Sequence, residues 1–175
     1  MRAAGQRGIK AILIYPMNAL ATDQANRVAK EIVSRPELRG ITAGLYVGDD
    51  GEAGDKSTQV KHVEGDRYTV ITDRVRLREE PPDILLTNYK MLDFLLLRAQ
   101  DKGLWKHNRP DTLRFLVVDE LHSFDGAQGT DLACLIRRLK ARLDMAPGAL
   151  ACVGTSATLG GEGAPRLLKF ARDVF

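Results

Sequence analysis

Short apolar runs that break into polar residues recur along the chain, and most of them show no alternation between apolar and polar positions. A continuous apolar run of this length is typical of a strand that is buried on both faces, as in a parallel sheet. The sequence predicts such strands at residues 11–15, 83–87, 115–118 and 150–154. Residues 41–47 also have β character, and residues 68–72 allow a short strand.

Between these runs, apolar residues recur at the spacing of an α-helix. The first predicted helix follows Pro16 and is capped by Asn18 or Thr22. Its apolar stripe consists of Ala21, Ala25, Val28, Ala29 and Ile32. Asn88 is expected to cap a second helix. The clearest helix spans residues 130–143, with the stripe Leu132, Leu135, Ile136, Leu139 and Leu143.

The alternation of strands and helices implies βαβ units and a parallel sheet, so the predicted fold class is α/β. A chain of 175 residues is long enough for one domain with a substantial core. We therefore interpret residues 1–175 as a single domain. Residues 48–82 are largely polar, with a start rich in glycine and aspartate, and are interpreted as a long surface excursion.

The apolar run at residues 115–118 leads directly into two carboxylates, Asp119 and Glu120. In open α/β sheets, ligands collect at the carboxyl ends of the strands. One carboxylate can hold a hydrated Mg²⁺, and the other can polarise an attacking water. The alternative is an acidic turn exposed to solvent, which needs no ligand. The carboxylate pair alone does not decide between these two interpretations.

Further segments accompany the carboxylate pair. His122 completes the sequence Asp-Glu-Leu-His, with ILIYPMNALATDQ and DILLTNYKML upstream and ACVGTSATLG downstream. In this order, the segments resemble motifs Ia, Ib, II and III of the superfamily 2 helicases of the DEAD/DEAH class. The resemblance covers about residues 12–159. It implies a RecA-like P-loop NTPase domain, in which helices flank a parallel sheet.

The resemblance implies a role for each matching residue. Asp119 would hold Mg²⁺, Glu120 would activate the water that hydrolyses ATP, and His122 would link the nucleotide site to motif III. Ser156 and Thr158 would lie at the nucleotide site and pass its state towards the nucleic acid. The alternative for Ser156 and Thr158 is a hydrogen-bonded turn that closes a strand, a role that serine and threonine often fill.

Motifs Ia and Ib of this family lie against the phosphate backbone of one nucleic-acid strand. The matching residues are Pro16, Asn18, Ala19, Leu20, Thr87 and Asn88. Helix N-termini expose backbone N–H groups that bind phosphates without reading bases, and polar side chains add further donors. The alternative is helix capping alone. The net charge of +3 permits nucleic-acid binding without arguing for it.

Two stretches narrow the resemblance. Leu86-Thr87-Asn88 and the region from Gly126 to Leu139 look like those of RecQ-related DNA-repair helicases. They also look like those of very large bacterial DEAD/DEAH helicases, some of which belong to anti-phage systems. The Asp-Glu-Leu-His box differs from the strict Asp-Glu-Ala-Asp box of RNA helicases. These features favour DNA over RNA as the partner.

The sequence lacks the phosphate-cradling loop Gly-x-x-x-x-Gly-Lys-Thr/Ser, which this family carries ahead of motif Ia. The Walker A strand that precedes this loop is therefore expected to be missing, so that residues 150–154 form an edge of the sheet. We expect a fragment of a larger ATP-dependent helicase, which needs the remaining helicase domains to hydrolyse ATP efficiently. The alternative is a non-catalytic nucleic-acid-binding module derived from such a domain.

Composition adds little to this picture. The apolar runs are too short to span a membrane, and no signal peptide is visible. Cys134 and Cys152 lie within apolar stretches and are expected to be buried free thiols, which favours a reducing, cytoplasmic compartment. The three histidines are scattered, and no Cys/His cluster has metal-ligand spacing.

Overall fold

A computed structural model describes residues 6–48, 70–124, 126–157 and 163–175. Its strands form one six-stranded sheet. The strand order is β3-β2-β4-β1-β5-β6. The strands are β1 (Ala11–Tyr15), β2 (Ala43–Tyr46), β3 (Val70–Ile71), β4 (Ile84–Asn88), β5 (Phe115–Val118) and β6 (Ala151–Gly154). Every pairing between them is parallel, which confirms the predicted α/β class with a parallel sheet.

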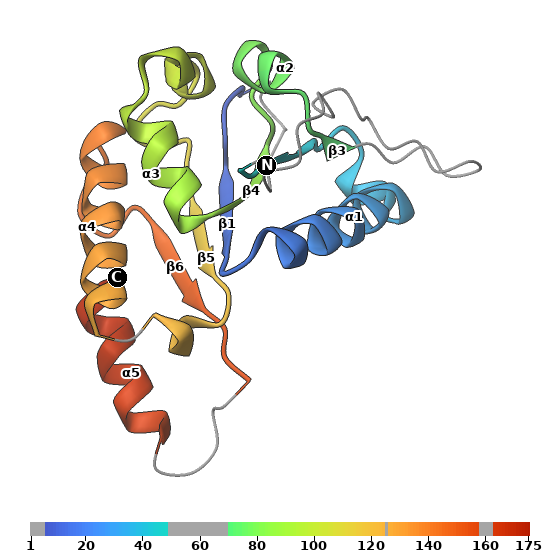
Figure 1. Cartoon of the computed structure of the whole chain (residues 1–175). Helices are drawn as coiled ribbons and strands as arrows, with labels where there is room; N and C mark the ends of the chain where they lie inside the picture. The colour runs from blue at the N-terminus through green and yellow to red at the C-terminus, as the bar shows by residue number, and fades with distance from the viewer. Residues whose placement is uncertain (1–5, 49–69, 125, 158–162) are drawn as a thin grey trace.

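Helices cover both faces of the sheet (Figure 1). α1 (Asn18–Ser34) packs on one face, against β1, β2 and β4. α3 (Tyr89–Leu97) and α4 (Ala127–Arg142) cover the other face, and α5 (Gly163–Val174) packs on α4. The shorter helices are η1 (Pro36–Leu38), α2 (Arg74–Glu79), η2 (Ala99–Trp105) and η3 (Leu121–Ser123). None of the helices in the described part of the chain is long and apolar enough to cross a membrane.

Alternate residues of the central strands point into two separate cores. In β1, Ile12 and Ile14 belong to the core beneath α3 and α4, whereas Tyr15 belongs to the core beneath α1. The apolar stripe predicted for α1 is confirmed. Its buried members are Ala21, Ala25 and Ala29. Their small side chains let α1 approach the sheet closely. The N-terminus of α1 lies at the carboxyl edge of the sheet because the helix directly follows β1.

The cap predicted for α1 is wrong. Met17 is the N-cap residue and provides no side-chain cap. Asn18 is already helical, and its side-chain oxygen accepts a hydrogen bond from Asn88 across the sheet edge. The Thr22 hydroxyl donates to the carbonyl of Asn18 inside the helix. A contact between distant residues therefore replaces the predicted local one.

The predicted surface excursion is described only in part, since residues 49–69 lie outside the described residues. β3 forms within the segment that allowed a short strand, and its two residues are buried. α2 follows, capped by Asp73, whose side chain accepts from the amide of Arg76. The sequence pattern does not predict α2. This helix has six residues and buries only Leu77, so it shows no repeating apolar positions. Residues 70–79 therefore belong to the packed domain.

Two predictions on and beside α4 need correction. The helix begins at Ala127 rather than at residue 130, so it includes part of the glycine-rich turn. Cys134 is exposed, because it lies off the buried stripe of α4, and Cys152 is half-buried on β6. Both thiols are free, as predicted.

A buried ion pair joins the amino ends of β1 and β4. Lys10 Nζ lies 2.7 Å from Asp83 Oδ1, and each side chain is 8% exposed. Lys10 Nζ also donates to the carbonyls of Gln6 and Gly8, while Asp83 Oδ2 accepts from the amide and hydroxyl of Thr42. Burial raises the pKa of Asp83, but the bonds with Lys10 and Thr42 together outweigh burial and lower the pKa below its ordinary value.

We expect Lys10→Met to lower the free energy of unfolding by about 3–5 kcal/mol at pH 7, because it leaves the Asp83 carboxylate buried without its cation. Since the folded-state pKa of Asp83 is lowered, the pair stabilises the fold above the ordinary aspartate pKa. This contribution is lost as the pH falls through the folded-state pKa. The difference between the two proteins should therefore shrink below about pH 4. Urea unfolding at pH 7 and at acidic pH measures it.

Arg35→Met is the matched control. Its ion pair with Glu31 joins side chains that are 59% and 60% exposed, so its loss should cost less than about 1 kcal/mol. Equal losses in the two variants would contradict a structural role for the buried pair.

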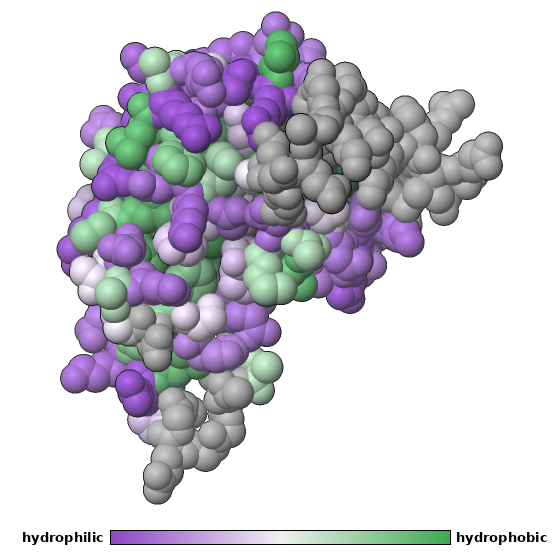
Figure 2. All heavy atoms as spheres, in the orientation of Figure 1, coloured by the Kyte–Doolittle hydropathy of each residue, from purple (hydrophilic) through white to green (hydrophobic). Residues whose placement is uncertain are grey.

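β6 forms one side of the described sheet, where it pairs with β5. Val153 on β6 is 47% exposed. Figure 2 shows hydrophobic residues reaching the surface in the region of β6 and the helices beside it. The amides of Ala151 and Thr155 point towards β5, because they donate to its flanking carbonyls. By the alternation of a strand, the amides of Cys152 and Gly154 point away from β5.

We expect the amides of Cys152 and Gly154 to exchange with solvent faster than those of Ala151 and Thr155, because β5 offers them no acceptor. Residue-resolved hydrogen exchange by nuclear magnetic resonance on a monomeric sample tests this. Slow exchange at all four amides would show that another segment pairs with the outer side of β6.

Candidate functional site

The carboxyl ends of β5 and β6 bring the predicted motif II and motif III residues together. β5 ends at Val118 and β6 ends at Gly154, and these two residues are register partners. The residues that follow, Asp119 and Thr155, therefore lie opposite each other at the edge of the sheet. The Thr155 hydroxyl donates to Asp119 Oδ1. The Asp119 amide donates to the carbonyl of Ile14, 2.9 Å away, which ties the site to β1.

Glu120 adopts a left-handed backbone conformation, with a φ of 50°. This conformation is uncommon for residues other than glycine, and such residues gather at functional sites. The Glu120 amide donates to Thr155 Oγ1 over 3.3 Å. Asp119 and Glu120 are both half-buried, so their carboxylates border the solvent. The turn that carries the two carboxylates is thus held by its backbone amides and by the Thr155 hydroxyl, and both side chains remain partly exposed to solvent.

His122 lies between the two predicted motifs. Its Nδ1 is 2.9 Å from Ser156 Oγ and 3.2 Å from Glu120 Oε2. The imidazole therefore lies between Glu120 and the segment that follows β6. Thr158, the other residue predicted for motif III, lies outside the described residues.

Tyr15 borders the same site from the end of β1. Burial is the main cause that raises its pKa to about 12, and the Asp119 carboxylate is the second, against an opposite effect of Arg27. The phenol therefore keeps its proton at neutral pH.

A second group of predicted residues meets at the carboxyl ends of β1 and β4. Asn88 Nδ2 donates to Asn18 Oδ1 over 2.6 Å, and Asn18 Nδ2 donates to the carbonyl of Gly48 over 3.4 Å. Asn88 Oδ1 accepts from the amide of Met91 over 2.7 Å, which confirms Asn88 as the cap of α3. The N-termini of α1 and α3 are therefore joined by a pair of amide side chains.

The remaining residues predicted for motifs Ia and Ib differ in exposure. Thr87 is fully buried, and its hydroxyl donates to the carbonyl of Tyr46 over 2.6 Å. Its side chain joins β4 to β2 and does not face solvent. Pro16 and Leu20 are half-buried, and Ala19 is exposed in the first turn of α1. Ala19 is therefore the exposed member of this group, and Pro16, Asn18, Leu20 and Asn88 reach solvent in part.

Thr155 is a site residue that the sequence motifs did not indicate. It stands directly before Ser156 and contacts both carboxylate-bearing residues. A signal for it exists in the sequence, because Asp119 and Thr155 each follow the last residue of a predicted strand. Recognising it requires the knowledge that these two strands are neighbours in register.

Asp119 and Glu120 fit a Mg²⁺ site that phosphate oxygens would complete. The described residues contain no group of three or more His, Cys, Asp or Glu side chains that would hold a metal alone. A Mg²⁺ that arrives with a nucleotide needs only one or two carboxylates, since phosphate and water supply its other ligands. The pair at the end of β5 meets this requirement.

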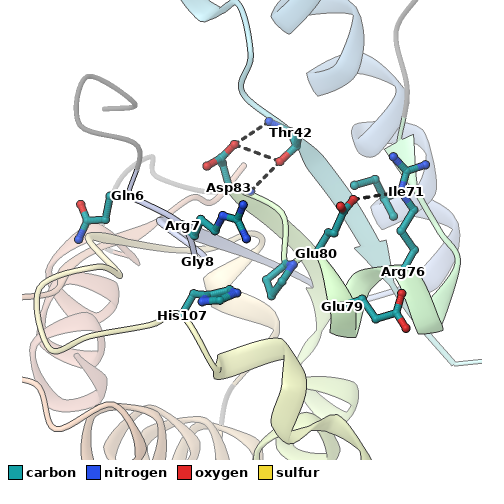
Figure 3. A pocket seen from close by; sticks show the side chains of 11 residues that line it. Gln6, Arg7, Gly8, Thr42, Ile71, Arg76, Glu79, Glu80, Asp83 and His107 are labelled. Atoms are coloured by element: carbon teal, nitrogen blue, oxygen red, sulfur yellow. Dashed lines mark hydrogen bonds and ion pairs between the residues drawn. The ribbon is translucent and has the colours of Figure 1, made fainter.

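A cavity of about 490 Å³ lies at the opposite edge of the sheet, near the amino ends of β1 and β4 (Figure 3). Arg7, Glu80 and His107 are among the side chains that surround it. Burial, followed by the nearby cations Lys106 and Arg7, lowers the pKa of His107. Asp83 in its wall is already engaged by Lys10 and Thr42. The cavity is thus separate from the carboxylate pair.

A family model described as DEAD/DEAH box helicase matches residues 1–166. Druantia protein DruE of Escherichia coli is 25% identical over 99% of this chain and 14% of its own length. The ATP-dependent helicase HRQ1 of Saccharomyces cerevisiae is 31% identical over 72% of this chain and 10% of its own length. The chain therefore spans a small part of these relatives.

Solved structures of helicases also match this chain. The crystal structure of the DUF1998 helicase MrfA matches with a TM-score of 0.59 and 25% identity, over 92% of this chain and 22% of that one. The helicase Lhr of Mycobacterium smegmatis, solved with ssDNA and AMP-PNP, has a TM-score of 0.60 and 24% identity, over 90% of this chain and 18% of that one. The Lhr match supports the fold alone.

Proposed function

The chain belongs to the DEAD/DEAH box helicase family and forms a RecA-like motor domain, and on this premise we propose that it contributes to an ATP-dependent DNA helicase. The observation that carries the proposal is the cluster at the ends of β5 and β6. Its members are Asp119, Glu120, His122, Thr155 and Ser156. The cluster lies inside the region that the family model matches.

The carboxylates take different roles in this proposal. Asp119 uses Oδ1 to accept from Thr155, so Oδ2 is the oxygen that would hold Mg²⁺. When bound, Mg²⁺ neutralises charge on the phosphates of ATP. Glu120 accepts the proton of the attacking water, which is the role that the resemblance to the helicase family implies for it. His122 contacts Ser156 and so joins this chemistry to motif III.

The phosphates of ATP need a cradle that this sequence does not provide. No segment of the chain reads Gly-x-x-x-x-Gly-Lys-Thr/Ser, and without such backbone donors and lysine the triphosphate is weakly held. We propose that another part of a longer helicase supplies this loop. The small share of each relative that the chain covers supports this proposal.

The nucleic acid lies in this proposal along the N-termini of α1 and α3. Backbone amides of the first turn, together with the Asn18–Asn88 pair, contact phosphates rather than bases. Pro16, Ala19 and Leu20 shape the entry to α1 and position those amides. Thr87 holds β4 against β2 from within. DNA is the proposed partner, because Lhr was solved with ssDNA and a structure of MrfA with DNA.

A second candidate function is a non-catalytic nucleic-acid-binding module. The observation that favours it is the absence of the phosphate-cradling sequence from these 175 residues. It predicts nucleic-acid binding that ATP does not affect. The helicase proposal predicts that the protein containing this domain hydrolyses ATP in the presence of DNA.

We expect Glu120→Gln to lower ATP turnover at least about a hundredfold in the protein that contains this domain, because the general base is lost. Nucleotide binding should persist, since Asp119 remains. Asp119→Ala should weaken Mg²⁺-ATP binding as well as turnover. Steady-state turnover and nucleotide affinity measure the two effects. Glu31→Gln, which changes an exposed carboxylate on α1, serves as the control. Normal turnover in Glu120→Gln would show that the role of Glu120 is misassigned.

We expect Asn88→Asp to weaken DNA binding about fivefold at low salt, because a new negative charge about 4 Å from a phosphate costs about 1 kcal/mol in water. The aspartate still caps α3, so folding should be retained, although it can no longer donate to Asn18 Oδ1. Asn26→Asp adds the same charge two turns into α1 and should have little effect. Affinity for unrelated single strands at two salt concentrations measures this. Binding that depends strongly on sequence and weakly on salt would contradict phosphate contacts.

A further inference from the structure

Thr155 contacts four consecutive residues of the turn that carries the carboxylates. Its amide donates to the carbonyl of Val118 over 3.0 Å, and its carbonyl accepts from the amide of Leu121 over 2.8 Å. Between these two backbone bonds, its hydroxyl donates to Asp119 Oδ1 and accepts from the amide of Glu120. The turn from Val118 to Leu121 is therefore fastened to one residue of the neighbouring strand end.

The side chain at this position needs a hydroxyl group. The Thr155 oxygen acts as donor to a carboxylate and as acceptor from an amide at the same time, which only a hydroxyl among small side chains achieves. The accepted bond holds the amide of Glu120, the residue in the left-handed conformation. Valine has the same shape but can make neither bond, whereas serine can make both.

Close packing adds to the connection between β6 and this turn. A Cβ atom placed on Gly154 would lie 2.5 Å from Leu121 Cδ2 and 3.3 Å from Leu121 Cβ. The backbone of β6 therefore approaches the start of η3 closely, directly beside Thr155. Packing at Gly154 and the bonds of Thr155 thus hold the end of β6 against the turn that carries the carboxylates.

We propose that Thr155 is a positioning residue for the metal-binding carboxylate and for the general base. Its hydroxyl holds Asp119 Oδ1 and thereby directs Oδ2 to Mg²⁺, and it fixes the backbone of Glu120. This proposal rests on the proposed function of Asp119 and Glu120. It differs from the role of Ser156, whose hydroxyl lies beside His122 rather than beside Asp119. Two adjacent residues after β6 thus contact different members of the Asp-Glu-Leu-His box.

The test compares Thr155→Val with Thr155→Ser in the protein that contains this domain. Thr42→Val is the matched control, because the Thr42 hydroxyl donates to Asp83 over 3.0 Å at the opposite edge of the sheet. The measurements are the Mg²⁺ concentration that half-saturates nucleotide binding, Mn²⁺ binding in the presence of nucleotide, and exchange of the Glu120 amide. Thermal unfolding reports any general loss of stability.

Thr155→Val should raise the half-saturating Mg²⁺ concentration about tenfold or more, as expected when a group that orients a metal ligand is lost. The Glu120 amide should exchange faster in this variant, because its acceptor is gone. Thr155→Ser should restore both values to near those of the unmodified protein. Thr42→Val should lower stability without moving the Mg²⁺ dependence.

An unchanged Mg²⁺ dependence in Thr155→Val, or a serine variant that behaves like valine, would overturn the proposal. If Thr155→Val does not fold, the unmodified protein still decides the structural part, because an unprotected Glu120 amide contradicts the bond to Thr155. Failure of the proposed function looks different. In that case the unmodified protein shows no Mg²⁺-dependent nucleotide binding, while the exchange difference between the valine and serine variants persists.

Discussion

The candidate site depends on the parallel register of β1, β4, β5 and β6. Since all of these strands run in the same direction, their carboxyl ends share one edge, and the residue after each strand lies beside its neighbours. Asp119 meets Thr155 because Val118 and Gly154 are register partners. Asn18 and Asn88 meet because Tyr15 pairs with Asn88. A slip of one residue in the pairing of β5 with β6 would no longer place Asp119 opposite Thr155.

Local chemistry explains the parts of the fold and site that the sequence predicts. The β5 run and its carboxylates, the helical stripe of α4 and the Asn88 cap all depend on neighbouring residues. The contact of Asn18 with Asn88 joins residues 70 positions apart, and propensity favours capping for either asparagine alone. Thr155 reaches Asp119 across 36 positions. The spacing of apolar residues does not reveal α2, because this helix buries only Leu77.

At the end of β5, the strained backbone of Glu120 is accompanied by a hydrogen bond from its amide to the Thr155 hydroxyl. The left-handed conformation of Glu120 is strained for a residue with a Cβ atom, and glycine at this position would remove the strain. Glycine would also remove the carboxylate that the proposed chemistry needs. The hydroxyl of Thr155 offers a different solution, because it accepts from the Glu120 amide in that conformation. The residue identity at position 155 is thus coupled to the backbone shape at position 120.

Carboxylates at the amino ends of the strands and at their carboxyl ends differ in whether a ligand can reach them. At the amino edge, Asp83 is enclosed by Lys10 and Thr42. This carboxylate stabilises the fold and is closed to ligands, even beside a cavity of about 490 Å³. At the carboxyl edge, Asp119 and Glu120 border solvent and are held mainly through one hydroxyl and through the backbone. The availability of a carboxylate, rather than the size of the nearest cavity, therefore favours the carboxyl ends of the strands as the place of the proposed chemistry.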